Sequence, residues 1–172
     1  MILLAQKYAA LLDRSEDQPE AIVEGMRTCF EVLSLTAAID RDCAARLGLH
    51  DLSEGKFVLL FLLQDAEDGL SPHELAERAG ITRGTVTGLV DGLERSGLVQ
   101  RASNDIDRRK LTIRLTAGGA ALIRRLTGEH SRWIGSLLSD LSAAERDTLR
   151  HLLAKVFART DAGTRKAAAH GA

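Results

Sequence analysis

The apolar residues of this chain recur mostly at intervals of three and four, the spacing that places side chains on one face of an α-helix. On this pattern we expect helices over 2–13, 20–47, 72–79, 83–96, 117–139 and 142–159, and one more that is capped by Ser53 and carries the run 57–63. The run 57–63 is apolar all round, so its helix is predicted to be central and buried. Only 98–102 and 110–115 alternate or are β-branched, as in the strands of a hairpin. The pattern therefore predicts a mainly α fold with one small β-hairpin.

Two of the predicted helices have the features of a helix-turn-helix. Ser71 precedes Pro72 and lies three residues before Glu74, which is a capping-box signal for a helix start. Ala76 allows two helices to cross closely, and Gly80 can adopt the positive φ of the turn. The second helix has an apolar side that we expect to face inward: Val86, Leu89, Val90 and Leu93.

The other side of that second helix is polar or small at its N-terminal end, which is where a recognition helix meets base edges. We expect these residues to contact DNA: Thr82, Arg83, Gly84, Thr85, Thr87 and Gly88. Each glycine inside a helix costs about 1 kcal/mol relative to alanine. Two explanations are open for Gly84 and Gly88, close approach to the DNA backbone or a fit against a neighbouring helix. No phosphate-loop motif is present.

The hairpin has a basic tip. Arg108 and Arg109 can enter a minor groove, where the electrostatic potential is most negative. Asp107 is expected to be structural, holding an arginine such as Arg101, which we also include among the DNA-binding residues. The formal net charge is −1, but residues 78–125 carry ten Lys/Arg against four acids, or +6. The rest of the chain therefore sums to −7. A basic segment on an acidic body is typical of a DNA-binding protein.

These residues resemble a known family. The segments ITRGTVTGLVDGLERSGLVQR and DRRKLTIRLTAGG are similar to the winged-helix core of MarR-type transcriptional regulators, over roughly residues 30–158. The resemblance implies a winged helix-turn-helix DNA-binding lobe (53–115) and a helical dimerisation lobe from both chain ends (20–52 and 116–159). An N-terminal helical extension (1–19) and a flexible tail (160–172) complete the expected organisation.

The resemblance also assigns roles. It implies that Asp107 braces the wing, that Arg109 enters the minor groove, and that Arg83, Thr85 and Thr87 line the major groove. It implies a cleft between the lobes where small phenolic or lipophilic ligands bind. The chain departs from the family at Gly92, where many relatives carry a basic residue.

A dimer is also expected from the residues themselves. The last two helices carry many apolar side chains that a single elongated subunit would leave in water, and a twofold dimer would cover them. The function expected is a homodimeric, sequence-specific DNA-binding repressor on a pseudo-palindromic operator, released by a small-molecule ligand. Residues 1–12 lack the basic start of a secretory signal, and no run of about 18 apolar residues predicts a membrane span. A cytoplasmic protein with no membrane partner is expected.

Two alternatives remain open. The first is an organic peroxide sensor, because Thr28-Cys29-Phe30 resembles the reactive-cysteine site of one branch of the family. A sensor thiol needs a lowered pKa, and an apolar cysteine in a helix interface is the simpler interpretation of Cys29. Cys43 lies about 21 Å along the same predicted helix, too far for a disulfide. The second is a non-DNA protein-interaction module. The sequence predicts no enzyme, cofactor or metal site, since no nucleophile–base set and no ligand spacing among the histidines is present.

Overall fold

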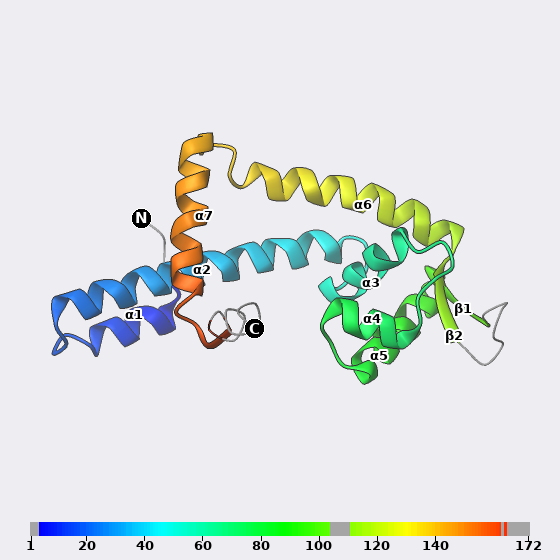
Figure 1. Ribbon diagram of the computed structural model, residues 1–172, viewed down its shortest axis with the longest axis horizontal. Helices are drawn as coiled ribbons and strands as arrows, with labels where there is room; N and C mark the ends of the chain where they lie inside the picture. The colour runs from blue at the N-terminus through cyan, green and yellow to red at the C-terminus, as the bar shows by residue number, and fades with distance from the viewer. Residues whose placement is uncertain (1–3, 104–110, 163, 165–172) are drawn as a thin grey trace. The chain divides into compact units, whose positions relative to one another are not determined.

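The computed structural model describes residues 4–103, 111–162 and 164. Within them the chain forms these elements, in order (Figure 1): α1 Gln6–Asp13, α2 Glu20–Gly48, α3 Glu54–Gln64, α4 Pro72–Ala79, α5 Arg83–Arg95, β1 Val99–Ser103, β2 Leu111–Leu115, α6 Ala117–Ser136 and α7 Ala143–Phe157. The chain divides into two compact units between Ile123 and Arg124, and α6 runs across the division. The predicted mainly α fold with one hairpin is confirmed.

Helix starts and ends are set by the residues that the sequence singled out. Ser71 Oγ accepts a hydrogen bond from Glu74 N (3.2 Å), and the Glu74 carboxylate accepts one from Ser71 N (2.8 Å). This capping box, with the Ser71 side chain as the larger cause, lowers the pKa of Glu74. Gly80 ends α4 with φ 67°. Ser142 forms the same capping box with Glu145 at the start of α7, whereas Ser53 and Thr82 cap α3 and α5 with the side-chain oxygen alone.

Some boundaries differ from those predicted. The first helix begins at Gln6, since Leu4 and Ala5 are not helical, and α6 ends at Ser136, because turns occupy the residues after it. Strand β1 starts one residue later than expected, at Val99, and residue 110, where the second strand was expected to begin, lies outside the described residues. Residues 161, 162 and 164 are helical where a loose tail was expected. A single turn closes there because Thr164 N and Oγ1 each donate to the Thr160 carbonyl at 3.0 Å.

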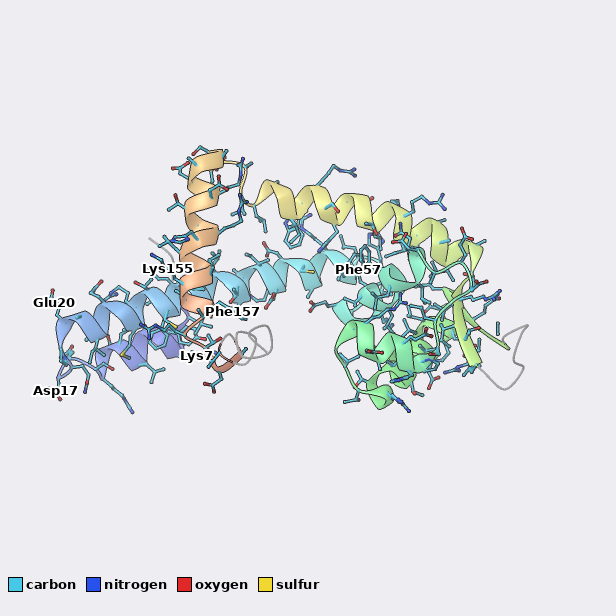
Figure 2. All side chains as sticks on the ribbon, in the orientation of Figure 1. Lys7, Asp17, Glu20, Phe57, Lys155 and Phe157 are labelled. Atoms are coloured by element: carbon cyan, nitrogen blue, oxygen red, sulfur yellow. The ribbon has the colours of Figure 1, made fainter. Side chains whose placement is uncertain are left out.

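The core that holds the helix-turn-helix lies between α3, α4, α5 and the hairpin. Its fully buried side chains come from all of these elements and include Leu59, Leu60, Leu75, Val86, Val90, Leu93, Val99 and Ile113. Each such side chain contributes about 1.5–3 kcal/mol by leaving water. The expectation that α3 is buried all round is wrong, because Phe61 is 46% exposed and Phe57 is half-buried (Figure 2). The buried residues of α3 are Leu59, Leu60 and Leu63, and the helix contacts α2, α4, α5 and β2.

The hairpin is joined to the loop before α4. Strand β1 pairs antiparallel with β2, so that Val99 faces Leu115 and Arg101 faces Ile113. Leu70 adds a bridge on the other side of β2, where Leu70 N donates to Ile113 O (3.0 Å) and Ile113 N donates to Leu70 O (2.8 Å). Sequence pattern did not predict this bridge, because a single residue has no periodicity. The backbone of the loop thus holds the hairpin against the helix-turn-helix.

The N-terminal helix packs on α2. The rings of Tyr8 and Phe30 stack with centroids 4.7 Å apart, and Ala5 N donates to Ser34 Oγ at 3.4 Å. The apolar stripe predicted on α2 is not covered by this contact, since Ile22 is 49% and Leu33 is 41% exposed. In the other unit, α7 has no buried side chain among its described residues.

Candidate nucleic-acid interface

Helix α5 has one buried side and one open side. Val86, Val90 and Leu93 are buried in the core, as the sequence predicted. The six residues predicted to contact DNA from α5 and its cap are all exposed: Thr82, Arg83, Gly84, Thr85, Thr87 and Gly88. The sequence pattern therefore separated the two sides of this helix correctly. Whether the exposed set binds DNA stays a prediction.

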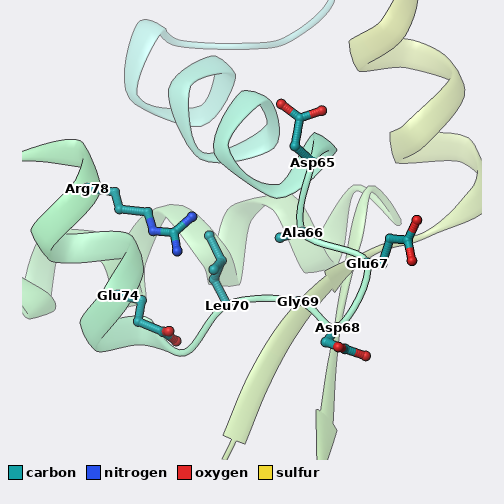
Figure 3. A pocket seen from close by; sticks show the side chains of 8 residues that line it. All are labelled: Asp65, Ala66, Glu67, Asp68, Gly69, Leu70, Glu74 and Arg78. Carbon is teal, nitrogen blue, oxygen red and sulfur yellow. The ribbon is translucent and has the colours of Figure 1, made fainter.

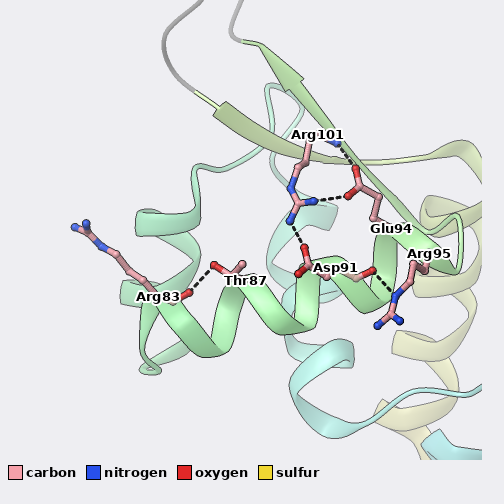
Figure 4. Close-up of polar contacts among 6 residues, drawn as sticks. All are labelled: Arg83, Thr87, Asp91, Glu94, Arg95 and Arg101. Carbon is pink, nitrogen blue, oxygen red and sulfur yellow. Dashed lines mark hydrogen bonds and ion pairs between the residues drawn. The ribbon is translucent and has the colours of Figure 1, made fainter.

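The polar groups at the start of α5 are not equally available to a ligand. The hydroxyls of Thr82 and Thr85 bond to each other (2.9 Å), and Thr87 Oγ1 donates to Arg83 O (3.0 Å). These hydroxyls are already engaged, although the threonine methyl groups remain free for apolar contact. Arg83 extends away from α5 and away from the hairpin (Figure 4). Among the residues that the structure describes, no carboxylate forms an ion pair with Arg83, so its guanidinium can bind an external acceptor.

The glycines of α5 do not serve one purpose. A Cβ built on Gly88 would meet nothing within 4 Å, and one on Gly84 would meet only Thr82 Oγ1 at 3.8 Å. No described helix therefore packs against Gly84 or Gly88. Close approach of the DNA backbone to these glycines stays a prediction. Gly92 is different, because its Cβ would lie 3.2 Å from Lys56 Cε.

Arg101 on β1 is turned toward α5 (Figure 4). Its guanidinium pairs with the carboxylates of Asp91 and Glu94, and its backbone N donates to Glu94 Oε1 at 3.4 Å. The hydrogen bond to Asp91 is the largest cause of a raised pKa for Arg101, which is thus protonated at any physiological pH. Arg101 was predicted to contact DNA and to be held by Asp107. The structure describes two acids on α5 as its partners, so Arg101 joins the hairpin to that helix. Its contact with DNA and its support by Asp107, which lies outside the described residues, stay predictions.

Three predicted residues at the hairpin tip, Asp107, Arg108 and Arg109, lie outside the described residues. Their assignment as the wing stays a prediction. The strands that carry the tip are described up to Ser103 and from Leu111.

The remaining candidate sites are weak. Cys29 is an exposed free thiol, and Cys43 is a half-buried one whose pKa is raised by burial and then by Glu54 and Asp40. A surface hollow beside β2 is lined largely by acids (Figure 3): Asp65, Ala66, Glu67, Asp68, Gly69, Leu70, Glu74 and Arg78. This hollow would repel phosphate. Over the described parts of the chain, no three or more metal-binding side chains gather, and no helix is long and apolar enough to cross a membrane.

Comparison with known proteins identifies the family. The MarR family model matches residues 52–111. The HTH-type transcriptional repressor YetL of Bacillus subtilis (strain 168) is 43% identical over 154 residues, which cover 89% of this chain and 92% of YetL. The chain belongs to the MarR family.

Other members of the MarR family agree. The HTH-type transcriptional regulator PecS of Dickeya dadantii (strain 3937) is 32% identical, covering 81% of this chain and 86% of PecS. The crystal structure of an S. aureus MepR–DNA complex has 25% identity and a TM-score of 0.63, covering 73% of this chain and 93% of MepR. The winged-helix fold that the sequence resemblance implied is thereby confirmed, and the chain is a MarR-family transcriptional regulator.

Proposed function

We propose that this protein is a repressor that binds a pseudo-palindromic DNA operator as a homodimer. The observation that carries the proposal is the open side of α5, where Arg83 lacks a described acidic partner and Gly84 and Gly88 leave space for a close approach. A recognition helix in a major groove uses its N-terminal residues to contact base edges. The names of the relatives support this, since YetL is a repressor and MepR was solved with DNA.

Exposed apolar side chains support the dimer. Val156 is 65% exposed, Leu152 51% and Phe157 48%. All three are on α7, where Figure 2 labels Phe157. Such a contiguous apolar surface marks an interaction site rather than a solvated one. Two copies related by a twofold axis would present two α5 helices to major grooves about 34 Å apart, one helical turn.

Two finer features belong to the same proposal. A small phenolic or lipophilic effector releases the operator, as the family resemblance suggests, and screening phenolic compounds against the preformed complex would identify it. Peroxide sensing through the exposed thiol of Cys29 stays an untested alternative. Salt dependence distinguishes DNA binding from the alternative of a protein-interaction module. The affinity of a DNA-binding protein for duplex DNA falls steeply as the salt concentration rises.

The first test concerns base reading by Arg83. The protein is titrated with its operator and with a scrambled duplex, by fluorescence anisotropy. We expect Arg83→Lys to lower the ratio of the two affinities by about 1–3 kcal/mol, because lysine keeps the charge but cannot hold guanine bidentately. Arg78→Lys, on α4, is the matched control and should leave the ratio unchanged. An unaltered ratio in Arg83→Lys would remove Arg83 from the base-reading surface.

A second test concerns Arg101. The Arg101→Met variant removes the cation that pairs with the carboxylates of Asp91 and Glu94. These unpaired negative charges would then repel the phosphates of the bound DNA. We expect the operator affinity to fall about tenfold or more, or about 1.4 kcal/mol. Adding Asp91→Asn and Glu94→Gln to this variant should recover part of the loss, because the exposed negative charges are then gone. Arg101→Met with wild-type affinity would show that the ion pairs are irrelevant to binding.

A further inference from the structure

The first turn of α3 crosses α5 at unusually short distance. A Cβ on Gly55 of α3 would lie 3.1 Å from Leu89 Cδ1, and a Cβ on Gly92 of α5 would lie 3.2 Å from Lys56 Cε. Each helix therefore presents a glycine at the point where the other helix presents a long side chain. Ser53 fixes the start of α3 at this crossing, since its Oγ accepts from Lys56 N at 3.4 Å.

The crossing holds the Lys56 side chain in place. Its alkyl chain lies over Gly92, and its ammonium Nζ lies 3.7 Å from where the Gly92 Cβ would be. Nζ donates to the backbone carbonyl of Asp51 at 3.3 Å, and no other hydrogen bond of this ammonium, which has three N–H donors, is seen among the described residues. Within the described residues no carboxylate forms an ion pair with Lys56. A positive charge is thus fixed beside α5 without being neutralised.

Lys56 and Arg101 lie on different flanks of α5. At 100° per residue, Gly92 is about 100° around the helix from Asp91 and about 160° from Glu94, the two partners of Arg101. Gly92 is only about 40° from Gly88, on the open side. The hairpin therefore borders one flank of the open side, and Lys56 borders the other. A helix inserted in a major groove has a phosphate backbone on both flanks, so a cation on either flank can bind a phosphate.

We propose that Lys56 binds a DNA phosphate on the flank of α5 opposite the hairpin, and that residue 92 is glycine because a larger side chain would displace Lys56. This role deepens the proposed DNA binding and depends on it. Lysine suits a phosphate contact because its ammonium is a point charge that needs no particular orientation of the acceptor. The contact would add affinity on every sequence, since phosphates carry no base information.

The test uses Lys56→Met, which keeps most of the alkyl chain over Gly92 and removes the charge. Affinities of the full-length protein for the operator and for a scrambled duplex are measured by anisotropy between about 50 and 200 mM salt. The salt slope is the slope of the logarithm of the affinity against the logarithm of the salt concentration. We expect its magnitude to decrease by about one per subunit. The affinity lost between the two salt concentrations should then be about threefold smaller for each subunit that carries the substitution. The ratio between the two duplexes should not change. Lys7→Met on α1 removes the same charge and should keep the wild-type slope.

A charge swap distinguishes a phosphate contact from a packing role. The variant that combines Lys56→Ala with Gly92→Lys carries the ammonium on α5 itself, on the same flank. Its salt slope should recover to the wild-type value. Lys56→Gln, checked by thermal melting, replaces Lys56→Met if that variant does not fold. A wild-type slope in the charge-removing variant, or an affinity loss with no change of slope, would overturn the role of Lys56. If the wild-type protein itself binds no duplex in dilute salt, the proposed DNA binding fails as a whole.

Discussion

Gly119→Ala is expected to destabilise the DNA-binding unit by about 3 kcal/mol, the upper end of the range for overpacking. A Cβ at this position would lie 1.9 Å from the carbonyl oxygen of Leu98 and 2.9 Å from its carbonyl carbon. Both are backbone atoms, so no side chain can rotate away. Thr116 N donates to the same Leu98 oxygen (3.1 Å), which fixes the start of α6 against the start of β1. Urea unfolding followed by circular dichroism measures the change.

The neighbouring glycine gives a matched control. Gly118 precedes it in the first turn of α6, is exposed, and would place its Cβ 3.7 Å from Thr116 Oγ1, an ordinary contact. Gly118→Ala should therefore be neutral or should stabilise the protein by up to about 1 kcal/mol through helix propensity. Equal unfolding midpoints for the two variants would show that α6 and β1 are not in contact as described.

The second large effect is expected from Leu152→Glu combined with Val156→Glu. These side chains share a face of α7 and are 51% and 65% exposed, so the subunit loses little packing. Charges on this face should prevent the proposed dimer. Operator affinity should fall about 100-fold or more, because the second half-site is then no longer bound within one assembly. Sedimentation measures the mass, and anisotropy measures the affinity.

A control pair on the opposite face of α7 separates dimer loss from added charge. His151→Glu with Ala154→Glu introduces two carboxylates away from the apolar stripe, on residues that are also exposed. This variant should remain a dimer and keep most of its operator affinity. Monomers with unchanged affinity for the full operator would contradict the proposed twofold recognition.

Local features of the fold were predictable from sequence, and non-local ones were not. The caps at Ser71, Thr82 and Ser142 involve residues three apart, so a short stretch of sequence contains both partners. The two sides of α5 follow from helical periodicity alone. In contrast, Leu70 pairs with a residue of β2 far along the chain, and its partner could not be inferred from pattern.

The candidate site shows the same division. Sequence identified the exposed residues at the start of α5, but it could not tell which polar groups were already engaged. Arg101 was included among the DNA-binding residues, and the sequence alone could not reveal its two acidic partners, which lie seven and ten residues earlier on another element. Lys56 was missed because it lies outside the basic segment. The signal that could have found it was Gly92, a costly helix residue whose vacant space another side chain fills.

The double pairing of Ile113 has a consequence for how such proteins acquire new targets. This residue is bonded to Leu70 on one side and faces Arg101 of β1 on the other. Because Leu70 is bonded to β2, lengthening the short segment between α3 and Leu70 would change the orientation of the hairpin relative to α5. Insertions there should therefore be selected against, and divergence in target preference should accumulate through side-chain exchange on α5 instead.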